Sequence, residues 1–423
     1  MKILVVGSGG REHALCFALK KSAKVSRIYC ANGNAGIGQI AELVDIKPNE
    51  ILKLADFAEQ NSIDLTFVGG ETSLALGIVD EFENRGLKII GVSKKAAELE
   101  ASKSFAKDFM SRQNIPTAKY KTANSTTEAV EILEAGEFGD ENAPVVVKAD
   151  GLAAGKGVVV APNRADAVAA INELENVVGK EATEKIVLEE CLFGREVSLI
   201  LFADGKNFAL MPPTRDHKRI GENDTGANTG GMGTITDENL LSEEQTATIV
   251  EKVIKPTLKG AESEGFPIKG IVFLGLMMTE SGAKVLEYNM RFGDPETQSI
   301  LVRLETDFLE ICEAIYSQTL DKIDIKWKKG NSACVILASK GYPAKAQTGD
   351  VISGLDEAEK LENITIFHAG TAKNENGEFV TSGGRVLGVT ATADSLGEAL
   401  DRAYEAVGKI SFEGMQYRRD IGK

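Results

Sequence analysis

Short apolar runs alternate with helical stretches at the start of the chain. The runs KILVVG, RIYCA, LTFVGG and KIIGV occupy residues 2–7, 27–31, 65–70 and 88–92. Such runs are typical of parallel strands buried on both faces, and the segments between them carry apolar residues at helical spacing. This alternation predicts a doubly wound parallel α/β sheet with its ligands at the carboxyl ends of the strands. We assign this N-terminal domain to residues 1–100.

The remainder of the chain is long enough for further domains. A helical segment within 101–116 stops at Pro116, and STTE at 125–128 is the signature of a capping box that opens another helix. From about 195 to 300, strands alternate with loops rich in glycine and charge. The runs CVILAS, TIFHAG and RVLGVTAT then predict the strands of a C-terminal α+β domain over residues 326–423.

The composition of the chain limits its partners. A net charge of −15 repels phosphate backbones, so nucleic acid is not expected as a ligand. The longest apolar run, IVFLGLMM at 271–278, is far shorter than a membrane span, and the first run reads as a strand rather than a signal peptide. Five scattered cysteines without a CxxC pair favour reduced thiols over disulfides or zinc. We expect a cytoplasmic protein without membrane partners.

The turn after the first strand reads GSGGREHAL over residues 7–15. A dinucleotide-binding fingerprint needs a third glycine where Glu12 stands, and an acidic residue at the end of the second strand, where this chain has Asn32. The amides and helix dipole of the turn still suit a phosphate, and Arg11 and His13 add a charge and a donor. We expect a phosphate-bearing small molecule here. A tight turn without any ligand is the alternative.

A second glycine-rich loop, KADGLAAGKGVVV, spans residues 148–160. Its spacing is one residue short of a Walker A loop, and Gly157 stands where that motif has the hydroxyl residue for magnesium. The amides of this loop can fold over phosphates, and Lys148 on the preceding strand is placed to reach the same phosphates. An ordinary glycine hairpin with solvated lysines is the alternative.

Two further stretches combine charge with loop composition. Glu189, Glu190 and Glu196 bracket the turn that follows the strand at 185–190, where they can bond an amino group and a ribose hydroxyl, although solvated surface acids are the simpler explanation. The stretch RDHKRIGENDTGANTGGMG at 215–233 is long and short of apolar residues, so function explains it better than packing.

The stretch VLEYNMRFGDPETQ covers residues 285–298. On a strand, Glu287 and Asn289 share one face, with Arg291 two residues further on. Two adjacent oxygen ligands on a rigid strand suit a magnesium ion that bridges nucleotide phosphates. The turn that follows offers the carboxylates of Asp294 and Glu296 to an amine or to hydroxyl groups.

Taken together, these stretches resemble the phosphoribosylamine–glycine ligase (glycinamide ribonucleotide synthetase) family, which are ATP-grasp enzymes of purine biosynthesis. GSGGREHAL, GNAG, SKSFAKDFM, KADGLAAGKGV, DHKR, NTGGMG and RFGDPETQ occur in the family's order along essentially the whole chain. The resemblance implies a two-lobed ATP grasp over 101–325, with a small mobile lobe at about 121–190, between the N-terminal domain and a C-terminal domain that completes the core. GGETSL at 69–74, NGNAG at 32–36 and TITD at 234–237 depart from the family pattern.

The resemblance also implies roles for individual residues. ATP would lie between the lobes, Mg²⁺ or Mn²⁺ would be held by Glu287 and Asn289, and Arg291 and Lys148 would act in catalysis. The residues implied at the nucleotide are Lys103, Lys148, Gly151, Gly155, Lys156, Gly157, Glu189, Glu190, Cys191, Leu192, Glu196, Arg219 and Asn228. Those implied at the other substrates are Gly9, Gly10, Arg11, His13, Asn34, Glu71, Asp216, Lys218 and Asp294.

The reaction that the resemblance implies joins glycine to 5-phosphoribosylamine at the expense of ATP, through glycyl phosphate. Such a transfer depends on positioning and charge neutralisation, which agrees with the density of cationic groups in these stretches. We expect closure of the second glycine loop to exclude water, and a monomer or weak homodimer. Three alternatives stay open: an ATP-grasp ligase for another carboxylate–amine pair, a non-catalytic ATP-binding regulator, and a dehydrogenase, against which Glu12 argues.

Overall fold

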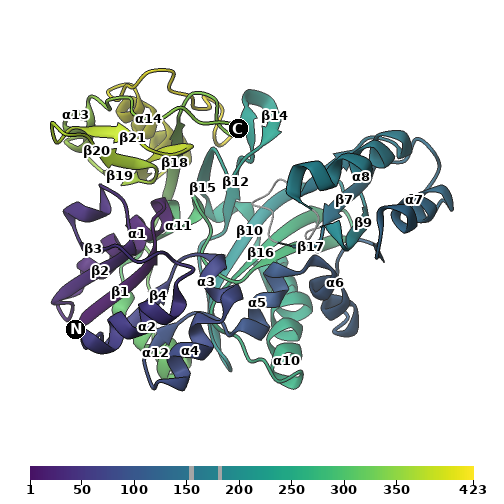
Figure 1. The fold of residues 1–423 in the computed structure, drawn as a ribbon, viewed down its shortest axis with the longest axis horizontal. Helices are drawn as coiled ribbons and strands as arrows, with labels where there is room; N and C mark the ends of the chain where they lie inside the picture. The colour runs from purple at the N-terminus through teal and green to yellow at the C-terminus, as the bar shows by residue number, and fades with distance from the viewer. Residues whose placement is uncertain (152–156, 180–182) are drawn as a thin grey trace.

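A computed structural model of the chain describes residues 1–151, 157–179 and 183–423. Figure 1 shows a central body of long strands with the N-terminal domain on one side, a small lobe projecting on the other, and the C-terminal domain above. Among the described residues, no helix combines the length and the apolar character that crossing a bilayer requires.

The N-terminal domain is the predicted doubly wound α/β unit. Its five strands are all parallel, in the order β3-β2-β1-β4-β5. They are β1 (Lys2–Gly7), β2 (Arg27–Asn32), β3 (Glu42–Val44), β4 (Leu65–Val68) and β5 (Ile89–Ile90). The accompanying helices are α1 (Gly10–Lys20), α2 (Ile51–Gln60), α3 (Glu71–Leu76), α4 (Ile78–Asn84) and α5 (Lys94–Ala101). Strand β3 was not predicted, because its three residues are exposed or half-buried and form no apolar run.

The small lobe is an antiparallel sheet with two helices on it. The strand order is β6-β9-β7-β8. Its elements are β6 (Tyr120–Ala123), α7 (Thr126–Glu134), β7 (Val145–Ala149), β8 (Val158–Ala161), α8 (Arg164–Val178) and β9 (Ile186–Glu190). Ser125 caps α7 as predicted, by accepting a hydrogen bond from the Glu128 N–H, while the Glu128 carboxylate accepts from Asn124 instead of closing the box on Ser125.

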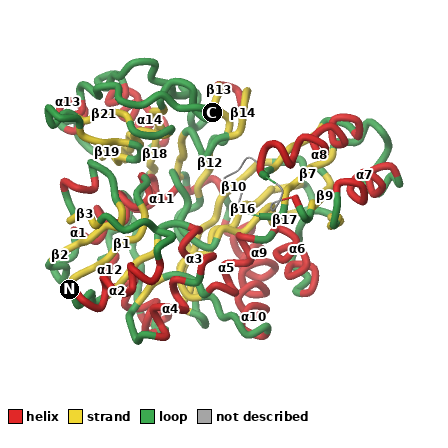
Figure 2. Tube along the Cα trace, viewed as in Figure 1, coloured by secondary structure: helices red, strands yellow, loops and turns green. Residues whose placement is uncertain are grey.

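A nine-stranded sheet runs through the middle of the molecule (Figure 2). Its order is β17-β16-β10-β12-β15-β18-β22-β19, with β11 beside β10, and its neighbours are antiparallel. The strands are β10 (Arg195–Asp204), β11 (Phe208–Leu210), β12 (Thr214–Asp216), β15 (Gly233–Thr236), β16 (Lys269–Thr279), β17 (Gly282–Asn289), β18 (Asn331–Ala338), β19 (Ile364–His368) and β22 (Arg385–Ala393). Because β18 pairs with β15, the C-terminal strands extend the central sheet, which the sequence did not indicate.

The other elements cover this sheet or lie at its ends. The helices are α6 (Lys103–Arg112), α9 (Glu243–Ile249), α10 (Lys255–Ser263), α11 (Glu296–Leu301), α12 (Phe308–Ser317), α13 (Leu355–Glu359) and α14 (Leu396–Val407). Two short hairpins, β13 (Arg219–Gly221) with β14 (Thr225–Asn228) and β20 (Thr371–Lys373) with β21 (Phe379–Thr381), stand apart from the larger sheets.

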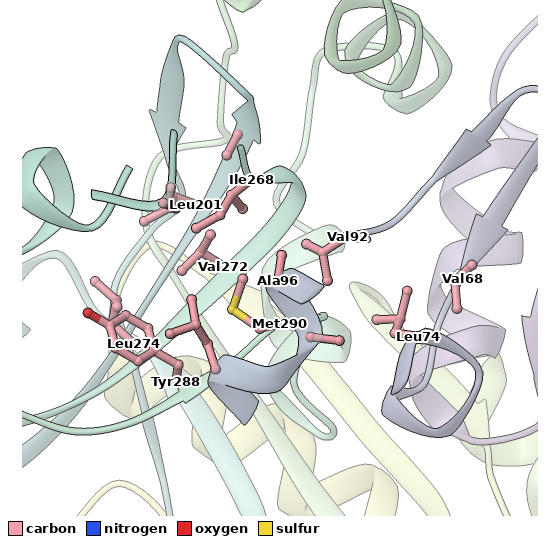
Figure 3. Packing of buried hydrophobic residues seen from close by; sticks show 14 of the residues in the cluster. Val68, Leu74, Val92, Ala96, Leu201, Ile268, Val272, Leu274, Tyr288 and Met290 are labelled. Atoms are coloured by element: carbon pink, nitrogen blue, oxygen red, sulfur yellow. The ribbon is translucent and has the colours of Figure 1, made fainter. Parts of the chain in front are cut away.

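The largest apolar core joins the N-terminal domain to the central sheet. Figure 3 shows Leu74 and Ala96 of the N-terminal domain in the same cluster as Val272 and Met290 of the central body. Burial of each Val, Leu or Met side chain in this cluster stabilises the fold by about 1.5–3 kcal/mol. One continuous core therefore fixes helix α5 relative to strand β17, and both elements carry residues of the cleft described below.

The TITD stretch at 234–237, which departs from the family pattern, begins on strand β15 of the central sheet. Thr234 and Thr236 are fully buried on β15. The Thr234 hydroxyl donates to the Pro295 carbonyl, and the Thr236 hydroxyl accepts from Arg303 at 2.9 Å. The residues that depart from the family pattern therefore lie where the central sheet packs against α11. There the two threonine hydroxyls form hydrogen bonds with buried polar groups.

Candidate active site

Two adjoining pockets lie between the small lobe and the central sheet. One is lined from α5, α6, β7 and β17, and the other from β7, β9, β10 and the segment 215–228. Lys148, Glu189 and Glu287 line both pockets. The two pockets therefore form one continuous cleft, whose junction is marked by these three charged side chains.

The predicted nucleotide residues converge on this cleft. Those that line the first pocket are Lys103, Lys148, Gly151, Gly157 and Glu189. Those that line the second are Lys148, Glu189, Glu190, Cys191, Leu192, Glu196, Arg219 and Asn228. Gly155 and Lys156, and with them most of the loop expected to close, lie outside the described residues.

A buried carboxylate holds two lysines at the cleft floor. Glu189 on β9 and Lys148 on β7 sit on neighbouring strands, and the Lys148 Nζ lies 2.7 Å from the Glu189 Oε1. The Lys107 Nζ on α6 lies 2.9 Å from the Glu189 Oε2 and donates to the Thr117 hydroxyl. Burial lowers the pKa of Lys107 to about 8 against the attraction of Glu189. Apart from Glu189, the Lys148 Nζ contacts the Leu286 carbonyl at 3.4 Å, whereas the Lys107 Nζ contacts the Thr117 hydroxyl at 2.7 Å. Lys148 is therefore held less firmly than Lys107.

Lys103 stands one helical turn before Lys107, so both lysines face the cleft. Its Nζ donates to the Gly151 carbonyl at 3.0 Å. The Asp150 carboxylate accepts from the Ser104 N–H and hydroxyl and from the Ser102 hydroxyl. The base of the glycine loop is therefore tied to the N-terminus of α6. Burial and the charge of Lys148 lower the pKa of Lys103.

Strand β17 presents the predicted metal pair to the cleft. The alternation of the strand sends Glu287 and Asn289 to the cleft side, while the Tyr288 hydroxyl is buried against the Thr257 hydroxyl at 2.7 Å. Burial alone would raise the pKa of Glu287, but the charges of nearby lysines, Lys218 foremost, lower it. The carboxylate is thus ionised.

This donor set fits a divalent cation that shares its ligands with a nucleotide. Within the described residues, no hydrogen bond reaches the Glu287 carboxylate, and no cluster of three or more His, Cys, Asp or Glu forms an all-protein metal site. A single carboxylate with an amide oxygen is what magnesium needs when phosphates complete its coordination. The Asn289 Oδ1 accepts from the Arg291 Nη2 at 3.0 Å, which holds the amide in place.

Arg291 is braced by two carboxylates of the N-terminal segment. Its Nη2 lies 2.8 Å from the Glu100 Oε1, and its Nε lies 3.3 Å from the Glu71 Oε2. Glu100 in turn accepts from the Met290 N–H. Burial raises the pKa of Glu100, and the charge of Arg291 opposes that rise. The guanidinium therefore points into the cleft from a fixed position.

The β1–α1 turn explains physically why a dinucleotide would not fit. The Glu12 side chain lies over the turn, so that a Cβ placed on Gly7 would come within 2.5 Å of the Glu12 Cδ. The Glu12 carboxylate accepts from the Gly9 N–H at 2.6 Å and from the Arg11 Nε at 2.8 Å. The Gly9 amide, which the sequence predicted to suit a phosphate, is therefore occupied by a carboxylate of the protein itself.

Seven of the nine predicted substrate residues fall into two groups, and the other two, Asp216 and Lys218, lie in the 215–233 stretch described below. Arg11, Glu71 and Asp294 come together: the Arg11 Nη2 lies 3.9 Å from the Glu71 Oε2, and the Arg11 N–H donates to Asp294. Gly9 and Gly10 belong to this group, because a Cβ on either would meet the Asp294 or the Gln298 side chain.

Asn34 and His13 form the second group, and their side chains form hydrogen bonds within the protein. The Asn34 amide donates to the Ser8 and His368 carbonyls, and the His13 Nδ1 accepts from the His368 N–H at 2.8 Å. Burial, followed by the neighbouring His368, lowers the pKa of His13 to about 3. A substrate contact is left to the Nε2 of His13 alone.

The 215–233 stretch folds into β12 and the β13–β14 hairpin instead of a bare loop. The Lys218 Nζ lies 3.1 Å from the Glu196 Oε2, and both side chains line the second pocket. Burial lowers the pKa of Lys218, but Glu196, Glu287 and Asp216 outweigh it and raise the pKa overall. Burial and the nearby Glu296 raise the pKa of Asp216. Lys218 and Asp216 therefore both line the second pocket, on the wall formed by the 215–228 segment.

Three functional residues were missed by sequence analysis. Lys107 belongs to the quoted SKSFAKDFM motif, and its helical spacing from Lys103 was a usable signal. Glu100 had no signal, because it precedes its partner Arg291 by almost two hundred residues. The Arg385 Nη1 donates to the Gly230 and Asp294 carbonyls at 2.6 Å each, from a strand in the last domain. Pairings of this kind depend on the fold and leave no local pattern.

Comparison with known proteins finds similar sequences along the whole chain. The Phosphoribosylglycinamide synthetase models match residues 1–100 with the N domain, 101–297 with the ATP-grasp (A) domain and 332–423 with the C domain. A phosphoribosylamine–glycine ligase of Caldanaerobacter subterraneus is 47% identical over 423 residues, covering 100% of this chain and 99% of the relative. One of Vibrio parahaemolyticus is 45% identical over 427 residues, covering 100% and 98%.

Solved structures show the same relationship. The crystal structure of phosphoribosylamine–glycine ligase from Thermotoga maritima has a TM-score of 0.85 at 31% identity and covers 100% of both chains. The biotin carboxylase domain of the Hydrogenobacter thermophilus 2-oxoglutarate carboxylase, solved with MgADP, ADP and bicarbonate, has a TM-score of 0.73 at 18% identity, covering 98% of this chain and 91% of that one, and shows a shared fold. From its family-model matches and its full-length relatives, the chain belongs to the phosphoribosylamine–glycine ligase family of ATP-grasp enzymes.

Proposed function

We propose that the cleft joins glycine to 5-phosphoribosylamine at the expense of ATP. The γ-phosphate passes to the glycine carboxylate, giving glycyl phosphate and ADP. The amine then attacks the acyl carbon, loses a proton and expels phosphate, giving glycinamide ribonucleotide. The convergence of Lys103, Lys148 and Lys218 around the ionised Glu287 carries this proposal, because phosphoryl transfer needs charge neutralisation and no covalent nucleophile.

The nucleoside would lie in the second pocket. Apolar side chains of Val146, Met277 and Leu286 line it, which suits the faces of a flat base. The chain from Glu190 to Leu192 lies on the same wall and offers backbone groups to the edge of the base. The exposed Glu196 carboxylate is within reach of ribose hydroxyls at the mouth of the pocket. Arg219 and Asn228 face them from the hairpin.

The phosphates would lie at the junction of the two pockets. Lys148 can exchange its contact with Glu189 for a phosphate oxygen, because Lys107 keeps the buried carboxylate paired when Lys148 leaves. Glu287 and Asn289 would hold Mg²⁺ or Mn²⁺. Such a metal neutralises phosphate charge and orients the transferred group when bound. Arg291, fixed by Glu100, would neutralise the developing charge beside it.

The other substrates would enter from the N-terminal side of the cleft. Glycine is an anion at its carboxylate. Arg291, which donates a hydrogen bond to Asn289, and Lys218, whose charge acts most strongly on Glu287, are cations beside the proposed metal pair. Arg11 would meet the phosphate of phosphoribosylamine, while Glu71 and Asp294 would accept from ribose hydroxyls or the amine. The support for this assignment is the close grouping of two arginines with two carboxylates beside the first pocket.

An assay of ADP release tests the proposal, with glycine and phosphoribosylamine each omitted in turn. We expect release only with both substrates. If glycine carries ¹⁸O in its carboxylate, each released phosphate should contain a labelled oxygen, seen as a shift in ³¹P NMR. Unlabelled phosphate, or release of pyrophosphate, would rule out glycyl phosphate. Activity with a different carboxylate–amine pair and none with glycine would instead favour the second candidate, an ATP-grasp ligase of other specificity.

A further inference from the structure

The β13–β14 hairpin lines the second pocket, the proposed nucleotide site, and makes few packing contacts of its own. Arg219 and Asn228 pair across its open end, and both line the second pocket. The two strands pair only with each other, and residues 222–227 are exposed. Ile220 is the side chain that packs the hairpin against an apolar cluster. A segment that buries so little has a low local stability of its own.

The tip of the hairpin is held by the C-terminal segment 418–420. Asn223 and Asp224 both have a left-handed backbone with φ of 53°, which costs energy in residues other than glycine unless neighbours enforce it. The Asn223 N–H donates to the Asp420 Oδ2, and the Asp224 Oδ1 accepts from the Arg418 Nη1, each at 2.7 Å. Within the described residues, every hydrogen bond recorded from the tip 222–225 to another segment goes to 418–420.

Arg418 is the centre of this contact. Its side chain is 2% exposed, and its Nη1 also donates to the carbonyl of Arg219 at 3.2 Å. Its Nε and Nη2 form a two-pronged pair with the Asp420 carboxylate at 2.8 and 2.7 Å. That pairing is the main cause that lowers the pKa of Asp420 to about 2. The Tyr404 hydroxyl on α14 donates to the Arg418 carbonyl, so the network is anchored in the C-terminal domain.

We propose that Arg418 is a positioning residue of the nucleotide site, which fixes the β13–β14 hairpin so that Arg219 and Asn228 face the nucleotide. The guanidinium holds the hairpin at two places, the Asp224 carboxylate at the tip and the Arg219 carbonyl at the pocket. Figure 2 shows the β13–β14 hairpin beside the C-terminal end of the chain. The C-terminal domain thereby becomes part of the ATP site. This inference rests on the proposed function, since it takes the second pocket to hold ATP.

The test compares Arg418→Met with Arg419→Met in the full-length enzyme. Arg419 is adjacent in sequence and 73% exposed, and its guanidinium reaches the hairpin only at 3.9 Å from Glu222, so it is a matched control. For Arg418→Met we expect the Kd and the KM for ATP to rise roughly ten-fold, the loss of one charge-assisted hydrogen bond, with the KM for glycine unchanged. Arg419→Met should leave all three constants at the wild-type value. Binding of ATP is measured by calorimetry and the KM values by ADP release.

Two further variants keep the proposal open to contradiction. Arg418→Lys keeps the charge without the planar fork, so it should recover part of the ATP affinity. If Arg418→Met fails to fold, Asp224→Ala carries the test, because this side chain is 71% exposed and its loss leaves the core intact. We expect a rise of about three-fold in the Kd for ATP from that variant.

Three outcomes overturn the inference: an unchanged ATP Kd in Arg418→Met, an unchanged ATP Kd in Asp224→Ala, or an equal loss of affinity for ATP and glycine. A wild-type enzyme that fails to bind ATP would contradict the proposed function itself. The two failures are therefore distinguishable.

Discussion

The nucleotide cleft and the β1–α1 turn are both built from a glycine-rich segment and cationic side chains, but they differ in how those cations are held. In the cleft, Lys148 and Lys107 contact different oxygens of the Glu189 carboxylate, so the charge of this carboxylate stays paired with Lys107 when Lys148 turns towards a ligand. At the turn, the Arg11 guanidinium lies between Glu12, Glu71 and the Phe292 carbonyl. A ligand at the turn must replace contacts that already exist.

The difference follows from where the partners come from in the chain. Lys148 and Glu189 lie on neighbouring strands of one small sheet. The contacts of Arg11, in contrast, reach Phe292 and Asp294 at the far end of the ATP-grasp region. The Lys148–Glu189 contact is therefore made within one small sheet, whereas the contacts of Arg11 depend on the docking of the N-terminal domain against the ATP-grasp region. Changes in the cleft should therefore act on chemistry, and changes at the turn on substrate affinity.

The largest effect should come from Glu287→Gln, which keeps the shape of the side chain and removes its charge. The carboxylate is the ionised group among Lys218, Lys148 and Lys103, so its loss removes the proposed metal ligand and leaves these cations unbalanced. We expect kcat to fall on the order of 10²–10³-fold and to recover in part at high Mg²⁺. Steady-state kinetics over a magnesium titration measure this.

The control for this variant is Glu280→Gln, which lies at the exposed turn of the same hairpin. It should keep the wild-type kcat and magnesium dependence. A Glu287→Gln enzyme with wild-type turnover at all magnesium concentrations would contradict the proposal that Glu287 on β17 holds the metal.

Lys107→Met should give the next largest effect, on stability. The variant leaves Glu189 buried with Lys148 as its only cation, and breaking a buried ion pair costs about 3–5 kcal/mol. We expect the lower end of that range, because Lys148 still compensates the carboxylate. Lys148 should also become less available, so that the KM for ATP rises.

Urea unfolding and ATP kinetics measure both effects of Lys107→Met. Lys121→Met, on an exposed position of strand β6, is the control and should change the free energy of unfolding little. A Lys107→Met enzyme as stable as the wild type, with an unchanged KM for ATP, would contradict the shared-carboxylate arrangement.

How far the sequence predicts the molecule depends on the range of the contacts involved. The parallel N-terminal sheet and the alternation of Glu287 and Asn289 on β17 follow from local periodicity, and the structure shows both. The described residues that the resemblance assigns to the nucleotide all line the cleft, because its motifs lie on the elements that form the cleft. Their contact with a nucleotide stays a prediction.

Contacts between segments that are distant in the sequence could not be predicted from local sequence patterns. Glu100 braces Arg291 through a carboxylate near the start of the ATP-grasp region, and Arg385 reaches Asp294 from the C-terminal domain. His13 was predicted to face the substrate on its position in the turn, but it lies in helix α1 with its Nδ1 on the His368 N–H. The positions and partners of these side chains depend on how the domains pack against each other.

Arg11→Ala tests the substrate side and should have a smaller effect than the changes in the cleft. Removing the guanidinium takes away a charge for the substrate phosphate, so the KM for phosphoribosylamine should rise about ten-fold while the KM for ATP stays nearly constant. Arg27→Ala is the control, because this arginine is 57% exposed in the same domain. An Arg11→Ala enzyme that changes the KM for ATP and leaves that for phosphoribosylamine would reverse the assignment of the two sites.

The smallest effect concerns the histidines and the pH dependence of stability. Burial lowers the pKa of His13 to about 3, and those of His217 and His368 to about 4. An unfolded histidine titrates near 6.5. As the pH falls from about 6.5 to about 5, the unfolded chain therefore binds protons that the folded chain does not, and the free energy of unfolding decreases.

Each such histidine contributes a slope of up to ~1.4 kcal/mol per pH unit in this window. His13→Asn keeps an acceptor for the His368 N–H and removes one titrating group, so its stability should fall less steeply with decreasing pH than that of the wild type. The buried Asp216 and Glu296, whose pKa values are raised, contribute in the opposite sense, but equally in both proteins. The difference between the two slopes, from urea unfolding at several pH values, therefore reports His13 alone. Equal slopes would mean that His13 titrates freely in the folded protein, available to a substrate instead of bound to the C-terminal domain.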